Sequence, residues 1–190
     1  MGFMLSRQPA ADALLDKDPL ALVIGMVLDQ QIPLEKAFSS PYVLTERLGH
    51  VPDAAEIAGM SEDDLVAVFS KPPALHRFPG SMAKRVQAMC QAVVDSYDND
   101  VTNVWTQAVD GGDLVKRVGA LPGFGKQKAQ IFVALLGKQY GVDVPGWREA
   151  AGEFGPEGTY KSVADIRDDA SLGLVREYKK QMKAAARAKA

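Results

Sequence analysis

A short turn with two glycines, Leu121-Pro122-Gly123-Phe124-Gly125-Lys126, carries the clearest chemical signal in the sequence. Glycine in such a turn lets the backbone reach φ > 0 and lets another backbone approach closely. The residues that follow are apolar at helical spacing, so a helix should begin here with unpaired N–H groups that point outward. The N-terminus of a helix attracts anions, and the turn is therefore a ready site for a phosphate.

Apolar segments with helical spacing, 114–118 and 129–136, flank this turn, which is the pattern of a helix-hairpin-helix. A hairpin of this kind grips one DNA strand by its backbone without reading sequence. The alternative is an ordinary corner between two helices. The expected DNA-backbone contacts are Gly123, Phe124, Gly125, Lys126 and Lys128.

One carboxylate stands alone after the hairpin: Asp143 is the only acidic residue between Lys116 and Arg148. It comes just past the end of the second expected helix. A carboxylate can stabilise positive charge that develops on a reacting group, and it can orient or deprotonate a water molecule. The alternative interpretation is a solvent-exposed loop aspartate.

Other kinds of chemistry have little support in the 190 residues of the chain. The single cysteine, Cys90, excludes a disulfide framework and a four-cysteine cluster within the chain, and its place on an apolar helix side indicates a buried small hydrophobe. The two histidines, His50 and His76, have no clustered partners, which argues against a metal enzyme. We find no signal-peptide pattern and no membrane-spanning run, so we expect a cytoplasmic protein, associated with the nucleoid if it is bacterial.

The net charge of −2 speaks against strong nonspecific DNA binding, but the charges are unevenly distributed. Acidic side chains concentrate between Thr45 and Asp64, where Arg47 is the only Lys or Arg. Segments 71–85 and 116–138 contain basic and no acidic side chains. This pattern predicts a basic face and an acidic back, the alternative being ordinary solvated helix faces.

The elements expected from the sequence are nearly all helices, with no strand pattern of any length. The helix from Leu20 to Gln31 is apolar on every side and should be central and buried, with Asp18-Pro19 at its start and Pro33 at its end. The other expected helices are 34–48 with an interruption near Pro41, 54–58, one after Ser61, one from 80 to 97, a short one at Trp105, the hairpin pair within 113–140, and 172–186.

Three separated segments resemble one family. Residues 19–31 are similar to a buried family helix that ends in a Gln-containing turn, and residues 78–86 to a helix start with an aromatic residue and a small polar pair. The hairpin is then followed by 142–148, similar to a Val-Asp-x-x-x-x-Arg pattern with a catalytic Asp. In this order the segments cover roughly residues 19–150 and make the chain similar to the HhH-GPD superfamily of base-excision DNA glycosylases.

The resemblance implies roles for particular residues. Asp143 would be the catalytic carboxylate, and Gln31 would enter the duplex beside an extruded base, although a polar residue at a helix end is the alternative for Gln31. The resemblance also implies a monovalent cation on the hairpin carbonyl groups, and we expect no side-chain metal site, no iron–sulfur cluster and no other cofactor. A base pocket could be lined by His76, Phe78, Tyr140 and Trp147, for which core packing is the alternative.

Two departures from the family pattern bear on the chemistry. Asp143 follows Gly125 at a shorter spacing than is usual in the family, and Val144-Pro145-Gly146 is an unusual continuation. Gln127 stands where bifunctional members carry a Schiff-base lysine. The sequence therefore predicts a monofunctional enzyme without a lyase step.

We therefore expect an all-α, bilobal HhH-GPD DNA-glycosylase-like helical fold with a helix-hairpin-helix motif. Residues 1–190 should form one unit of two helical lobes, the first about 30–130 with the hairpin and the second 1–29 plus 131–190. The expected function is that of a monomer that binds double-stranded DNA with a damaged base and removes the base as a monofunctional DNA N-glycosylase. The alternatives are a noncatalytic binder of DNA lesions or structures and a helical protein-interaction module.

Overall fold

The computed structural model describes residues 2–190, and this part of the chain is helical and without strands, which confirms the expected all-α class. The elements are α1 (Pro9–Lys17), α2 (Pro19–Leu28), α3 (Leu34–Leu48), α4 (Ala54–Gly59), α5 (Glu62–Ser70), α6 (Pro79–Tyr97), α7 (Asn103–Thr106), α8 (Gly111–Gly119), α9 (Lys126–Gln139), α10 (Trp147–Ala150), η1 (Gly152–Phe154), η2 (Val163–Asp165) and α11 (Asp169–Ala188). In the described chain no helix is long and apolar enough to cross a membrane.

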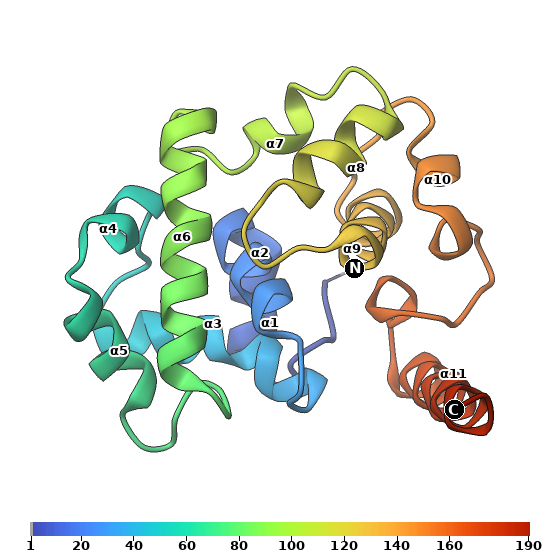
Figure 1. The fold of residues 1–190 in the computed structure, drawn as a ribbon, viewed down its shortest axis with the longest axis horizontal. Helices are drawn as coiled ribbons and strands as arrows, with labels where there is room; N and C mark the ends of the chain where they lie inside the picture. Colours follow the sequence, from blue (N-terminus) through green and yellow to red (C-terminus); the bar gives the residue numbers. More distant parts are fainter. Residues whose placement is uncertain (1) are drawn as a thin grey trace.

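The helices form two groups with α2 between them (Figure 1). On one side α4 and α5 pack against α6, and on the other α8, α10 and η2 pack against α9. Helix α2 contacts both α3 and α6, and all its residues from Leu20 to Leu28 are buried. This confirms the prediction of a central helix that is apolar on every side.

The predicted start of α2 and those of two later helices are confirmed by their caps. The side chain of Asp18 accepts the backbone N–H of Ala21 at 3.0 Å, which satisfies one of the free donors of the first turn. Asp53 and Ser61 do the same for α4 and α5. Helix α1 was not predicted. Its N-cap is Gln8, which is not a typical capping residue and makes no side-chain cap hydrogen bond.

The interruption predicted near Pro41 is wrong, because α3 runs unbroken through it. Proline removes one helical hydrogen bond and crowds the preceding turn, which favours a break. Here Pro41 lies on the buried face of α3 together with Phe38 and Leu44, and the Ser40 hydroxyl donates to the Leu75 carbonyl at 2.8 Å. Burial of this face offsets the local cost of the proline.

Candidate functional site

The predicted hairpin is present: α8 ends at Gly119 and α9 begins at Lys126. Gly123 has φ +95, the left-handed conformation predicted for a glycine of the turn. A Cβ at Gly123 would also lie 3.0 Å from Cγ1 of Val27, so this glycine packs against α2.

The second glycine of the turn differs from the first. Gly125 has φ −94 and ψ 179, an extended backbone that any residue adopts, and a Cβ there would meet no atom within 4 Å. The positive φ expected of the turn is therefore supplied by Gly123 and not by Gly125. Its missing side chain instead leaves open space in front of the first turn of α9.

The first turn of α9 leaves backbone donors free. Gly125 caps the helix without a side-chain hydrogen bond, and the first helical bond into this cap runs from the N–H of Ala129 to the Gly125 carbonyl at 2.9 Å. The N–H groups of Lys126, Gln127 and Lys128 accordingly have no intrahelical acceptor. Both Lys126 and Gln127 are exposed, so an anion can approach these donors from solvent.

The end of α2 lies directly against this hairpin. The Lys128 ammonium donates to the Val27 carbonyl at 3.2 Å, and the Gln30 side-chain amide donates to the same oxygen at 3.0 Å. On the other side, the Arg85 guanidinium in the second turn of α6 donates to Oε1 of Gln30 at 3.3 Å. Residues far apart in the sequence therefore form one junction between α2, α6 and α9.

The chain turns sharply after α2, before the proline that was predicted to end the helix. The Gln30 N–H donates to the Leu28 carbonyl at 2.7 Å, and Gln31 has φ +57. Gln31 is exposed at the tip of this turn. A left-handed backbone at a residue other than glycine is uncommon and is a reason to look for function nearby.

His76 holds this turn in place. Its Nδ1 accepts the N–H of Phe78 at 3.0 Å, so the other nitrogen, Nε2, carries the proton and donates to the Gln30 carbonyl at 2.9 Å. Burial of the ring lowers the pKa of His76, which is only 2% exposed. The ring therefore offers no free face to a base, whereas the neighbouring Phe78 is 43% exposed.

Two charged groups of the junction are partly withdrawn from water. Burial raises the pKa of the Asp29 carboxyl, against the opposing effect of Lys179 and Lys128. Burial likewise lowers the pKa of the Lys128 ammonium to about 8, against the opposing effect of Asp29. Sequence reasoning missed Asp29, although an acid at the end of a wholly apolar helix was a usable signal.

The predicted catalytic residue, Asp143, lies at the opposite end of α9. The 14 residues of α9 separate its two ends by about 20 Å at about 1.5 Å per residue. Asp143 is exposed and lines a groove of about 490 Å³ with Trp105, Tyr140 and Pro145. The structure therefore does not bring Asp143 together with the hairpin, and its catalytic role stays a prediction.

The two aromatic residues predicted beside Asp143 belong largely to the core. Tyr140 stacks on Phe3 with ring centroids 6.0 Å apart, and burial raises its pKa. Trp147 is 7% exposed and covers Gly137, where any side chain would overlap its indole. The four predicted base-pocket residues therefore do not line one pocket, because His76 and Phe78 lie at the other end of α9.

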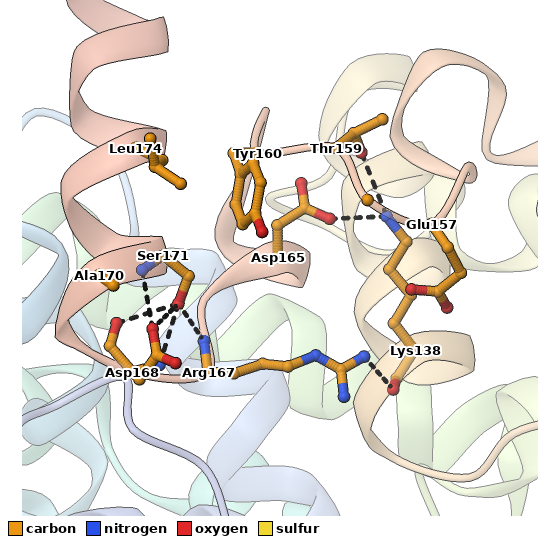
Figure 2. A pocket seen from close by; sticks show the side chains of 11 residues that line it. Lys138, Glu157, Thr159, Tyr160, Asp165, Arg167, Asp168, Ala170, Ser171 and Leu174 are labelled. Carbon is orange, nitrogen blue, oxygen red and sulfur yellow. Dashed lines mark hydrogen bonds and ion pairs between the residues drawn. The ribbon is translucent and has the colours of Figure 1, made fainter.

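A buried ion pair fixes the C-terminal end of α9 (Figure 2). The Lys138 ammonium lies 2.6 Å from Oδ1 of Asp165 and donates to the Pro156 carbonyl at 2.8 Å. Oδ2 of Asp165 accepts the backbone N–H groups of Lys161 and Ser162. A cavity of about 240 Å³ lies beside this pair, and the Lys138 and Asp165 side chains in its lining already satisfy each other.

The remaining predictions concern the single cysteine and the possible cation sites. Cys90 is buried, and burial raises the pKa of its thiol to about 12, which confirms a packing role. No group of three His, Cys, Asp or Glu side chains in residues 2–190 could hold a metal ion. The carbonyls of Val118 and Leu121 accept backbone N–H groups in the hairpin, and the monovalent cation that the resemblance implies stays a prediction.

Comparisons with known proteins agree with this geometry at the level of the family. A family model described as HhH-GPD superfamily base excision DNA repair protein matches residues 24–181. The matched range includes the end of α2, the hairpin and most of α11. No curated protein and no solved structure matched the chain. The chain belongs to the HhH-GPD superfamily of base excision DNA repair proteins, whose members bind DNA.

Proposed function

We propose that the protein binds duplex DNA through its hairpin and removes a damaged base as a monofunctional DNA N-glycosylase. The observation that carries the proposal is the open first turn of α9, where exposed backbone donors follow Gly125 without a capping side chain. Backbone N–H groups and the Lys126 ammonium suit phosphate oxygens of any sequence. Membership of a family of base excision DNA repair proteins supports the same assignment.

The turn after α2 suits the second requirement of base excision. Chemistry on a base needs the nucleotide to leave the stack, and a side chain can fill the gap. Gln31 is exposed beside the hairpin junction on a left-handed backbone, and its neighbour Gln30 is fixed by Arg85 and His76. A duplex held at α9 would therefore meet a rigid turn with Gln31 at its tip.

Duplex binding can be tested at Gly125, because this glycine is not needed for the fold. We expect Gly125→Val to fold normally, since a Cβ there meets no atom within 4 Å, and to weaken duplex binding about tenfold by covering the free N–H groups. Gly59→Val is the matched control in α4, where a Cβ also meets no atom within 4 Å. The measurement is fluorescence anisotropy with duplexes of unrelated sequence.

Salt dependence supplies the second measurement of binding. About two to four phosphate contacts should make the affinity fall with rising salt, with a slope of log K against log salt near −2 to −4. Affinity that does not change with salt, or a folded Gly125→Val variant with wild-type affinity, would contradict the hairpin contact.

We expect the enzyme to lack a lyase step after base removal. Gln127 occupies the second position of α9, and its amide cannot form an imine with an abasic sugar. Borohydride treatment with abasic-site DNA should therefore give no covalent adduct. An adduct that disappears in Lys126→Ala or Lys128→Ala would show that a neighbouring lysine replaces the missing amine.

A noncatalytic DNA binder is the second candidate function. The observation in its favour is the place of Asp143, which is exposed and separated from the hairpin by the length of α9. A panel of duplexes with alkylated, deaminated and oxidised bases separates the two candidates. Release of a free base supports the glycosylase, whereas salt-sensitive binding without release on every duplex supports the binder.

A further inference from the structure

Asp29, the residue that ends α2, is a carboxylate near the junction with the hairpin. Its neighbour Val27 contacts both the turn, through Gly123, and α9, through the Lys128 ammonium. The next residues, Gln30 and Gln31, form the exposed turn beside the hairpin. Asp29 therefore stands between the DNA-facing hairpin and the side chain expected to enter the duplex.

The Asp29 carboxylate has no polar partner among the described residues. It is half-buried, and within residues 2–190 the structure gives it no hydrogen bond and no ion pair. Partly withdrawn polar groups normally have partners, and an exception needs an explanation. Lys179 and Lys128 both act against the burial that raises the pKa of this carboxyl, and the Lys128 ammonium donates to the Val27 carbonyl two residues before Asp29.

The other acids around this region are already engaged. Glu35 forms an ion pair with Arg176 of α11, and Asp113 accepts from the Arg117 guanidinium at 2.8 Å. Asp143 lies beyond the far end of α9. Asp29 is thus the acid at the hairpin whose oxygens remain without a protein donor in the described chain.

We propose that Asp29, and not Asp143, is the carboxylate that faces the sugar of the extruded nucleotide, and that Lys128 is its positioning residue. This proposal rests on the proposed glycosylase function and identifies the reacting group of that site. The class of ligand is a deoxynucleotide whose sugar carries positive charge at C1′ during bond cleavage.

The reaction that this geometry supports needs only water. The bond between C1′ and the base nitrogen breaks with its electron pair going to the base, and C1′ becomes cationic. The Asp29 carboxylate stabilises this charge, and a water oxygen forms the new bond to C1′ while its proton passes to Asp29. The proton then leaves Asp29 for the released base, so that the products are a free base and an abasic sugar.

A charged abasic analogue tests the proposal without knowledge of the damaged base. One duplex carries a pyrrolidine in place of the sugar, with a protonated nitrogen at the C1′ position, and a second carries an uncharged tetrahydrofuran. We expect wild type and Asp143→Asn to bind the pyrrolidine duplex at least about tenfold more tightly than the tetrahydrofuran duplex, as for one charge-assisted contact. In Asp29→Asn this ratio should fall to near one.

The outcomes separate this proposal from the proposed function. Equal binding of both duplexes by wild type, or a ratio retained in Asp29→Asn, overturns the assignment of Asp29. If wild type does not bind the tetrahydrofuran duplex at all, the hairpin is not a DNA site, and both proposals are wrong. Asp29→Asn should fold, because the carboxylate makes no hydrogen bond that the amide would lose, and thermal unfolding checks this.

The pH profile of the same ratio tests the positioning role of Lys128. The charged groups that face Asp29 are Lys128 of α9, Lys179 of α11 and Glu35 of α3. Removal of the Lys128 charge raises the pKa of Asp29 further, so that Lys128→Met should lose the preference for the pyrrolidine duplex at a higher pH than wild type as the pH falls. Lys128→Arg should restore the wild-type profile, and Lys161→Met, which removes a charge paired with Glu153, should keep it. An unchanged profile in Lys128→Met would overturn the positioning role.

Discussion

The two ends of α9 treat their charged side chains in opposite ways. At the C-terminal end, the Lys138 ammonium and the Asp165 carboxylate are fully enclosed and bonded to one another (Figure 2). At the N-terminal end, Lys128 and Asp29 are half-buried and joined by no ion pair in residues 2–190. A charged pair that is buried and satisfied holds a fold together, whereas charged groups partly withdrawn from water and joined by no ion pair can still bind a ligand.

The difference between the ends follows from what covers them. The loop from Gly155 to Ser162 and η2 close over Lys138, and Thr159 and Pro156 supply further oxygen atoms. At Lys128 the hydrogen bond comes from the end of α2, where the Val27 carbonyl accepts one of the three N–H donors of the ammonium. Lys128 at the N-terminal end therefore keeps N–H donors free in the described chain, whereas Lys138 at the C-terminal end uses its donors within the fold.

The largest expected effect comes from breaking the buried pair. Lys138→Met should lower the free energy of unfolding by about 3–5 kcal/mol, because it leaves the Asp165 charge buried without its counter-ion. Lys161→Met is the control, since its ion pair with Glu153 is partly exposed and should contribute under about 1 kcal/mol. Chemical denaturation measures both. Equal losses in the two variants would contradict the structural role assigned to this end.

The second expected effect concerns base excision. Asp29→Asn should lower the single-turnover rate on a susceptible duplex by roughly a hundredfold, because the positive charge on the sugar loses its nearby anion. Asp143→Asn should change the rate by less than about twofold, since Asp143 follows the far end of α9, a helix about 20 Å long. The opposite result would restore Asp143 as the catalytic residue and assign the chemistry to the C-terminal end.

The third expected effect separates the two hairpin glycines. Gly123→Ala should cost about 1–2 kcal/mol of folding stability, since alanine disfavours φ +95 and its Cβ would press on Val27. Gly125→Ala should be neutral or slightly stabilising, because the backbone there is ordinary and the space is open. Thermal unfolding measures both variants, and similar losses would mean that the turn constrains both positions.

Much of the fold could be predicted from the sequence because its signals are local. The apolar residues of α2, the caps at Asp18, Asp53 and Ser61 and the glycine turn act within a few residues of the chain. The interruption predicted at Pro41 was wrong because the burial that offsets the cost of this proline comes from other helices. Local patterns therefore located the hairpin but not everything that packs on it.

The candidate site was less predictable, because it is built from long-range contacts. Lys128 and Val27 are 101 residues apart, and Arg85 and Gln30 are 55 apart. Asp143 seemed close to the hairpin because it follows the same helix, but a straight helix carries its two ends apart. Only the arrangement of α2, α6 and α9 shows that Asp29 lies at the hairpin.

The smallest expected effect is the titration of Lys128 itself. Burial lowers the pKa of its ammonium to about 8, from an ordinary value near 10.5. The unfolded chain then binds more protons than the folded one between about pH 8 and pH 10.5, so stability relative to Lys128→Met should rise with pH across this window. After reductive methylation with ¹³C-formaldehyde, one dimethyl-lysine signal should titrate near pH 8 and be absent in Lys128→Arg.

The charged groups that face Lys128 are Asp29 and Arg85. Because Asp29 raises the pKa of Lys128, Asp29→Asn should move this signal to a still lower pH, whereas Asp143→Asn should leave it in place. A full set of lysine signals that titrate near pH 10.5 would mean that Lys128 is solvated like the other lysines, and the contrast between the two ends of α9 would then lose its electrostatic basis.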